Sequence, residues 1–363
     1  MIRIAVACGG TGGHIFPGLA TANELIRRGH DVTLWLAGKD VENAAVRGWS
    51  GAVVTVPAQG FPGGFSLAAA RSAYRLFRAV GQVAADMRKN PPDVVLAMGS
   101  YASVGPVGAA IRLGLPFVMH ESNVIPGRAV RLFARWASMV GGCFDETRFY
   151  LRNRPFVVTG MPLRQDLLEA SEKDHTDHDG FRLLVMGGSR GAKRVNELVS
   201  EALVALHVGG VTLDVVHLTG EQDLERIRAV YADAGMPANV QAFTQSIGAL
   251  YARTDFAICR AGAATCAELS LFGIPSLLIP YPHAIHDHQT FNARAMEKIG
   301  AADMVPESDV TVDWLRSYIS QMIRQSDRRK QMAVNARSRA SGDGAARLAD
   351  VVEQTAIMRR HAS

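Results

Sequence analysis

Two glycine-rich turns contain the residues of this chain that are best suited to chemistry. Residues 9–14 read Gly-Gly-Thr-Gly-Gly-His, and residues 187–192 read Gly-Gly-Ser-Arg-Gly-Ala. Each turn follows a short apolar run and precedes a helical pattern. A strand that turns on glycines into a helix leaves backbone N–H groups and the positive end of the helix dipole facing a crevice. This arrangement suits an anion such as a diphosphate, so each turn predicts a site for one charged substrate.

A second group of polar side chains lies between residues 259 and 292. Glu268 follows a loop of small residues and falls in the next predicted helix, where its carboxylate can accept hydrogen bonds from both hydroxyls of a ribose. Gln289 and Asn292 are three positions apart and therefore share a helical face. Their amides offer paired donors and acceptors, which are typical of groups that bind vicinal sugar hydroxyls.

A metal site is an alternative interpretation of the same region, because His283, His286, Asp287 and His288 are close in sequence. We favour a polar loop, since no partner ligands with matched spacing occur elsewhere. Residues 177–179 (Asp-His-Asp) have the letters of the Asp-x-Asp motif of metal-dependent glycosyltransferases, but they lie in a polar connecting stretch.

Two other nucleotide-binding motifs are excluded by spacing. Counting from Gly10 and Gly12, the third glycine of a dinucleotide-binding fingerprint is replaced by Ile15. Neither turn ends in Gly-Lys followed by Ser or Thr, so neither is a P-loop.

The elements that must position these residues alternate between apolar strands and helices. In the first half, strands are predicted at residues 2–8, 31–36, 52–56, 93–98, 116–120, 139–141 and 156–159. In the second half they are predicted at residues 181–186, 212–218, 240–243, 256–259, 276–279 and 302–305, with helices from residue 311 to the end. Such alternation predicts two α/β domains, each with a doubly wound parallel sheet.

Two domains also agree with the length of 363 residues. The polar stretch at residues 169–180 is the predicted linker. Ligands of such sheets bind beyond the carboxyl ends of the strands, so we expect the two domains to enclose a cleft.

Composition limits the cellular location and the partners. The sequence contains no uninterrupted run of about 18 apolar residues and begins directly with a strand, so we expect a cytoplasmic protein. The four cysteines have neither metal-ligand spacing nor the density of a disulfide scaffold and are expected to be reduced. The net charge of +5 favours an anionic partner. Nucleic acid is not expected, because no zinc-finger, RNP-type or basic-tail pattern is present.

Residues 61–89 suggest a contact with an anionic membrane. Arg71, Arg75 and Arg78 form one helical stripe among the apolar residues Leu67, Tyr74, Phe77 and Val80. Such a helix can lie on an anionic leaflet, although an amphipathic helix that turns its apolar side to the core fits the pattern equally well.

These motifs, in order and over nearly the whole chain, resemble the MurG family of bacterial glycosyltransferases. The resemblance rests on the two glycine turns and on segments 99–106, 120–123, 260–268 and 283–292. The sequence departs from the family pattern at Ser122, where the family usually has Gln, and residues 103–105 look one residue longer than is common.

The resemblance implies a GT-B architecture of two Rossmann-like domains. Residues 1–162 with a C-terminal helix at about 341–363 would bind the acceptor and face the membrane, and residues 163–340 would bind the donor. It implies inverting transfer of N-acetylglucosamine from UDP-N-acetylglucosamine to the 4-hydroxyl of the muramoyl unit of lipid I, which gives lipid II. Implied donor contacts are Thr11, Gly12, Gly13, Arg164, Ser189, Arg260, Ala263, Ala264, Glu268, Gln289 and Asn292. Implied acceptor contacts are His14, Tyr101 and Asn123.

His14 is the first candidate for the general base, and Glu121 is the second. The resemblance also implies a peripheral position on the cytoplasmic face of the inner membrane, no cofactor, and partners in the cell-wall synthesis and division machinery. Two alternative functions remain open, namely another GT-B enzyme, such as a lipid glycosyltransferase or UDP-sugar epimerase, and a non-catalytic nucleotide- or membrane-binding module.

Overall fold

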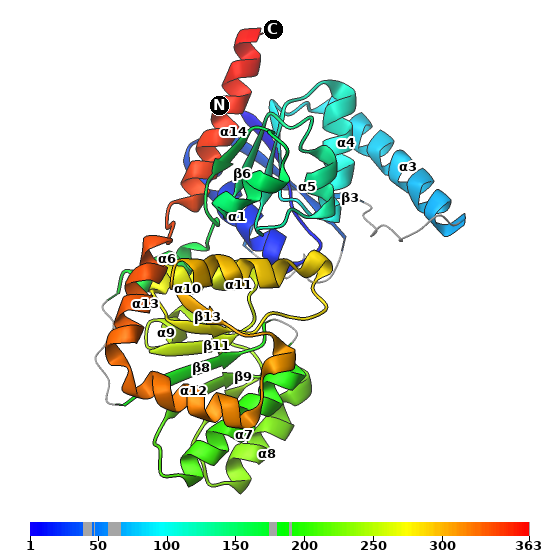
Figure 1. Cartoon of the computed structure of the whole chain (residues 1–363). Coiled ribbons are helices and arrows are strands. Elements are labelled where there is room, and N and C mark those ends of the chain that lie inside the picture. Colours follow the sequence, from blue (N-terminus) through cyan, green and yellow to red (C-terminus); the bar gives the residue numbers. More distant parts are fainter. Residues whose placement is uncertain (39–45, 47, 57–66, 174–179, 189–190, 363) are drawn as a thin grey trace. The chain divides into compact units, whose positions relative to one another are not determined.

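The computed structural model describes the chain except residues 39–45, 47, 57–66, 174–179, 189–190 and 363. The chain forms two compact units, Met1–Arg164 with Ser341–Ser363, and Gln165–Ala340 (Figure 1). The sequence prediction ended the first domain at residue 162. Leu163 and Arg164 belong with the first unit because Leu163 is buried and the Arg164 guanidinium lies over the ring of Phe16, 5.3 Å from its centroid.

The first unit is built on a seven-stranded parallel sheet with the order β3-β2-β1-β4-β5-β6-β7. Its strands are β1 (Arg3–Ala7), β2 (Asp31–Ala37), β3 (Ala52–Val56), β4 (Val94–Ala97), β5 (Phe117–Glu121), β6 (Met139–Gly142) and β7 (Phe156–Val158). Its helices are α1 (Gly12–Arg27), α3 (Leu67–Lys89), α4 (Val104–Leu113), α5 (Arg128–Phe133) and α14 (Gly344–Ala362), with the 3-10 turns η1 (Tyr101–Ser103) and η2 (Asp145–Tyr150).

Both faces of this sheet are covered by helices, which is why its strands are almost continuously apolar (Figure 1). Ile4 and Val6 of β1 pack in the layer formed by α1 and α14. Ala5 and Ala7 alternate with them and pack in the layer formed by α3, α4 and α5. The apolar core of the first unit therefore has two layers.

The second unit has a six-stranded parallel sheet with the order β10-β9-β8-β11-β12-β13. Its strands are β8 (Arg182–Met186), β9 (Asp214–Leu218), β10 (Asn239–Gln241), β11 (Phe256–Cys259), β12 (Ser276–Leu278) and β13 (Ala302–Met304). Its helices are α6 (Gln165–Ser171), α7 (Lys193–Val208), α8 (Leu224–Asp233), α9 (Ile247–Tyr251), α10 (Ala263–Phe272), α11 (His288–Lys298), α12 (Val312–Arg324) and α13 (Ser326–Ser338), with η3 (Glu221–Asp223), η4 (Ile285–Asp287) and η5 (Glu307–Asp309).

The predicted fold class is confirmed, and each predicted strand matches an observed one, with ends that differ by up to two residues. The predicted linker is wrong in part, because residues 169–171 belong to α6 and the chain passes between the units after Arg164. The sequence pattern of α6 did not indicate a helix, because α6 exposes its polar side and buries little more than Leu167. Within the described residues, none of the helices combines the length and apolar content needed to cross a membrane.

Ion pairs attach α14 to the first unit. Arg28, at the end of α1, pairs with Asp350 and Glu353 of α14 at 2.6 and 2.8 Å and with Glu24 at 2.7 Å. The Arg27 guanidinium, together with that of Arg28, lowers the pKa of the Glu24 carboxyl from 4.5 to about 2. A lowered carboxyl pKa contributes stability above its ordinary value, and this contribution is lost as pH falls through the folded value.

We expect Glu24→Gln to lower the free energy of unfolding by about 1 kcal/mol at neutral pH and low salt, because a neutral amide keeps the shape but not the ion pairs. The difference from the unmodified chain should shrink as pH falls from 4.5 toward 2. Urea denaturation at a series of pH values measures it. Glu225→Gln is a matched control, because Glu225 is exposed and pairs with Arg228 in the second unit. A difference that does not change with pH would contradict this assignment.

Candidate active site

The first glycine turn follows β1, at the point where the strand order reverses between β2 and β4. Gly10 has φ +90°, and a Cβ at this position would lie 2.6 Å from Cε1 of Tyr101. Only glycine therefore allows the aromatic ring to approach the turn so closely. The first turn of α1 contains no acidic side chain, and Thr11 at the N-cap does not cap the helix with its hydroxyl. The turn keeps the character of an anion site.

His14 is half-buried in the first turn of α1. Its Nδ1 lies 2.9 Å from the hydroxyl oxygen of Thr11, and its backbone N–H donates to the Thr11 carbonyl oxygen at 3.0 Å. The hydroxyl therefore holds the imidazole against the glycine turn. Tyr101 and His14 thus lie at one edge of the sheet.

Glu121 ends β5 at the same edge of the sheet and is buried. One carboxylate oxygen accepts from the backbone N–H and the side-chain amide of Asn123 at 2.9 and 3.2 Å, and the other accepts from Gly127 N–H at 2.7 Å. Burial raises the pKa of this carboxyl, while the same hydrogen bonds oppose the rise. Glu121 is therefore occupied in holding the loop that follows β5.

The second glycine turn follows β8, at the corresponding reversal between β9 and β11. Gly191 has φ +74°, and a Cβ there would lie 2.5 Å from the Thr219 carbonyl oxygen. Ser189, the predicted diphosphate contact, lies outside the described residues.

A buried polar network that sequence reasoning missed supports this turn. Asn196 of α7 donates to the Thr219 carbonyl and to Asp223, both at 2.9 Å. His217 lies 3.2 Å from the Asn196 amide oxygen and 2.9 Å from the hydroxyl of Tyr231. Burial lowers the pKa of His217 to about 3, so the network contains a neutral imidazole at physiological pH. The sequence did contain a signal for this network. Asn196 in α7 and His217 in β9 are polar residues at positions where the pattern of a buried element requires apolar ones.

Arg260 follows β11, but its guanidinium is buried and bonded to protein groups. One nitrogen donates to the carbonyl oxygens of Ile279 and Pro280 at 3.2 and 3.0 Å, and another pairs with Glu307. The guanidinium also lies 5.5 Å from the ring centroid of Tyr281. Arg260 therefore joins the loops at the carboxyl ends of β11, β12 and β13.

Glu268 lies in α10 and is oriented by Tyr251, whose hydroxyl donates to Oε2 at 2.8 Å. Tyr251 was not singled out from the sequence, because a buried tyrosine in α9 looks like a core residue. Ala263 and Ala264 begin α10, with Gly262 at the N-cap and no side-chain cap bond. The backbone N–H groups at this helix start are therefore not capped by the side chain of the N-cap residue.

Asn292 and Gln289 lie in α11, as predicted, and both also contact the protein backbone. The Asn292 amide donates to the Ala261 carbonyl oxygen at 3.1 Å, and the Gln289 amide oxygen accepts from Tyr281 N–H at 3.0 Å. His286 and Asp287 just before α11 both have φ +54°, an uncommon conformation for residues with a Cβ. Among the described residues, no group of three His, Cys, Asp or Glu side chains is arranged to hold a metal ion.

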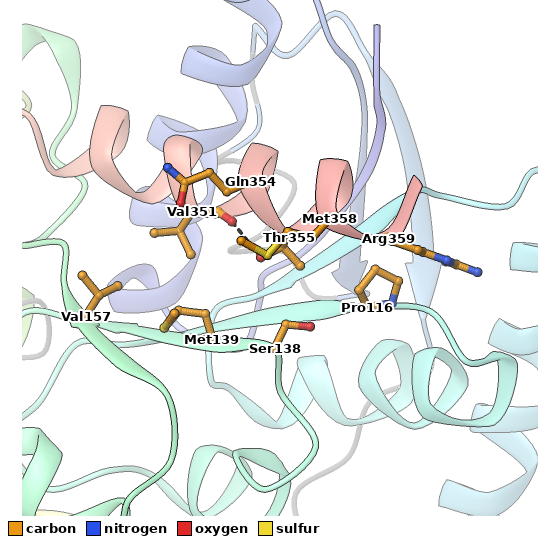
Figure 2. Close-up of a pocket in the computed structure, with 9 residues that line it drawn as sticks. All are labelled: Pro116, Ser138, Met139, Val157, Val351, Gln354, Thr355, Met358 and Arg359. Carbon is orange, nitrogen blue, oxygen red and sulfur yellow. Dashed lines mark hydrogen bonds between the residues drawn. The ribbon is translucent and has the colours of Figure 1, made fainter. Parts of the chain in front are cut away.

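The first unit also contains a groove of about 390 Å³ away from these residues. Figure 2 shows Met358 and Thr355 of α14 beside Met139 and Ser138 at the start of β6. This groove lies at the amino-terminal ends of β5 and β6, whereas the glycine turn lies at the carboxyl ends of the strands. It is therefore not part of the candidate site.

Family models match both halves of the chain. The glycosyltransferase family 28 N-terminal domain matches residues 4–141, and its C-terminal domain matches residues 182–350. A Myxococcus xanthus protein named UDP-N-acetylglucosamine--N-acetylmuramyl-(pentapeptide) pyrophosphoryl-undecaprenol N-acetylglucosamine transferase is 36% identical over 97% of this chain and 92% of its own length. A Rhodospirillum rubrum protein of the same name is 38% identical over 98% of this chain and 92% of its own length. The chain belongs to the MurG family.

Solved structures agree with this assignment. The crystal structure of MurG from Acinetobacter baumannii superposes with a TM-score of 0.82, at 28% identity, and covers 98% of this chain and 100% of that one. A putative UDP-N-acetylglucosamine 2-epimerase from Listeria monocytogenes superposes with a TM-score of 0.69 at 13% identity over 96% of this chain and 94% of its own, which shows the shared fold alone. The expected two-domain GT-B architecture is confirmed.

Proposed function

We propose that this chain transfers N-acetylglucosamine from UDP-N-acetylglucosamine to the muramoyl 4-hydroxyl of lipid I, with inversion, and so forms lipid II. The observation that carries the proposal is the match of the whole chain to curated transferases of this name, at 35–39% identity. The site geometry supports it independently. Each unit has a glycine turn at its topological switch point, as expected for an enzyme that binds two phosphate-bearing substrates.

The donor is assigned to the second unit. Glu268, held by Tyr251, would accept the ribose hydroxyls. Gln289 and Asn292 would bind the N-acetylglucosamine hydroxyls, with the backbone of Ala263 and Ala264 beside the sugar. The bonds of Arg260 to Glu307 and to two carbonyl groups favour a role in shaping the sugar loop over direct contact with phosphate. Ser189 and Arg164 remain the proposed diphosphate contacts, with Thr11, Gly12 and Gly13 of the first turn.

The acceptor is assigned to the first unit, where Tyr101 and Asn123 would contact it. His14 is the better candidate for the general base, because both carboxylate oxygens of Glu121 already accept hydrogen bonds from the following loop. The covalent step is one displacement, in which the 4-hydroxyl oxygen attacks the anomeric carbon, its proton passes to the base, and UDP departs. Helix N-termini stabilise the charge gained by the diphosphate, and a positioned base adds about 10²- to 10⁴-fold in rate.

The lipid-borne acceptor requires contact with a membrane, and we assign this contact to α3 on the cytoplasmic face of the inner membrane. Arg71 and Arg78 are exposed, and Phe77 between them is 69% exposed. Val83 and Met87, farther along the helix, are buried against the sheet. The side chains of Leu67, Tyr74 and Arg75 lie outside the described part of the structure. An exposed phenylalanine flanked by arginines is typical of a helix that rests on an anionic surface.

The function is tested by incubating the protein with UDP-N-acetylglucosamine and a lipid I analogue. We expect release of UDP together with a disaccharide whose new linkage is inverted at the anomeric carbon. An epimerase would convert the donor without an acceptor, and a binding module would retain UDP without turnover. Either of those results would exclude the transferase function.

We expect His14→Ala to lower turnover by about 10²- to 10⁴-fold and to change UDP affinity little, because the proposed ribose and sugar contacts lie in the second unit and His14 is not among the proposed diphosphate contacts. The fall in rate on the acidic side of the pH profile should disappear, since the group whose protonation causes it is gone. Glu268→Ala is the complementary variant and should weaken UDP binding by about 10- to 100-fold, because charged hydrogen bonds to the ribose are lost. Calorimetry measures both affinities. Normal turnover of His14→Ala with the acidic limb retained would assign the base role to Glu121.

We expect replacement of Arg71, Arg75 and Arg78 by Gln to reduce flotation with anionic vesicles, since each basic residue near the surface contributes about 1 kcal/mol. Turnover of a soluble acceptor analogue should not change. Arg316→Gln with Arg324→Gln on α12 is a control that removes two positive charges from the second unit. Equal flotation of the triple variant and the unmodified chain would mean that the membrane contact lies elsewhere.

A further inference from the structure

His120, next to Glu121 in β5, is a fully buried imidazole that the proposed reaction does not yet use. Its Nε2 lies 3.2 Å from the carbonyl oxygen of Gly160 and 3.6 Å from Sγ of Cys143. Because a carbonyl oxygen only accepts hydrogen bonds, Nε2 must carry the proton and donate it. Burial lowers the pKa of His120 to about 4, so the ring is neutral at physiological pH and its Nδ1 is a bare acceptor.

The Nδ1 atom of His120 is buried and has no hydrogen-bond partner among the described residues. An unpaired buried acceptor destabilises a protein, and an apolar side chain of similar size would avoid this cost. The presence of a histidine at this position therefore indicates that the hydrogen bond from its Nε2 to the Gly160 carbonyl oxygen has a role.

Alternation along β5 sends His120 and Glu121 to opposite faces of the sheet. Val118 packs in the layer formed by α1 and α14, and Met119 packs in the layer formed by α3, α4 and α5. His120 therefore points toward the α1 and α14 side, where a positive charge on His14 would be close enough to lower the pKa of His120. Glu121 points to the other side and binds Gly127 at the start of α5.

The partner of His120 lies in the segment by which the chain leaves the first unit. Gly160 has φ +78°, and a Cβ there would lie 2.4 Å from Oγ of Ser341, the residue at which the chain returns. The Ser341 hydroxyl donates to the Thr159 carbonyl oxygen at 3.4 Å, and a Cβ on Gly344 would lie 2.5 Å from the Met161 carbonyl oxygen. The leaving segment (residues 159–161) and the returning segment (residues 341–344) are thus packed together in the first unit. We call them the crossing segments.

We infer that His120 is a positioning residue, which ties the acceptor loop after β5 to these two crossing segments through its hydrogen bond to Gly160. The inference rests on the proposed function. Two neighbouring residues of β5 make these connections. Glu121 binds the acceptor loop through Gly127, and His120 binds the crossing segments through Gly160. A displacement of the crossing segments is then transmitted to Glu121, Asn123 and His14, so the geometry of the acceptor site depends on the path of the chain between the units.

Three substitutions of His120 separate this role from simple core packing. In His120→Gln the amide nitrogen reaches the position of Nε2 and keeps a donor for Gly160, whereas in His120→Asn it reaches only the position of Nδ1. His120→Leu retains bulk without a donor. We expect the Asn and Leu variants to lose about 10- to 100-fold in kcat/KM for a lipid I analogue, with UDP affinity unchanged, and the Gln variant to retain most of the activity.

Val352→Ala calibrates the effect of lost stability, because Val352 is a buried residue of the same layer in α14. If the three variants lose activity only in proportion to their Tm, as Val352→Ala does, His120 is a core residue and the inference fails. Nitrogen-15 NMR of the imidazole must show a neutral ring protonated at Nε2; an Nδ1–H tautomer or an imidazolium at neutral pH also overturns it. Absence of transfer by the unmodified chain is a different result and overturns the proposed function.

Discussion

In each unit, the candidate site residues depend on a chain reversal that leaves no room for a Cβ atom. A Cβ on Gly187 would lie 2.4 Å from the backbone nitrogen of Ala192, and one on Gly10 would lie 2.6 Å from the ring of Tyr101. These contacts bring the end of a buried strand and the start of a helix close enough to direct backbone N–H groups at one point. Each reversal lies where the strand order changes direction, which is the place where doubly wound sheets generally bind their ligands. The other site residues come from the adjoining strands at the same edge.

Much of this arrangement could be predicted from the sequence, because the determinants are local. Apolar runs of strand length, glycines after the first run of each half and helical patterns between strands specify a parallel doubly wound sheet. Glu268, Gln289 and Asn292 could be placed because their spacing relative to β11 and β12 fixes them at the carboxyl edge. The linker was placed too late in the chain, since α6 is short and mostly polar and its helical pattern is weak.

The hydrogen bonds that hold the candidate site residues in place could not be predicted, because they join distant parts of the sequence. Tyr251 orients Glu268, and Asn196 with His217 supports the second turn, yet each looks like an ordinary core residue in its own segment. The same reason explains why the protein partners of Arg260 and Glu121 could not be predicted. Their types and positions suit a phosphate or a proton, and only the fold reveals that carbonyl groups, Glu307 and loop amides already engage them. Residues that hold the site and residues that contact substrate use the same side-chain chemistry, so tertiary contacts are needed to tell them apart.

The first unit is discontinuous in sequence, and this has a consequence for biosynthesis. Leu348, Val352 and Ala356 of α14 belong to the core layer that covers one face of its sheet, and they are translated after the whole second unit. Residues 165–340 can complete their own core on the ribosome as one continuous segment, whereas the sheet formed by residues 1–164 must wait with one face incompletely covered. The exposed strip consists of Val94, Leu96 and Val118, which is an apolar surface that chaperones recognise and that aggregation exploits. Synthesis of α14 closes this surface, so the order of translation makes the first unit the last part of the chain to complete its core.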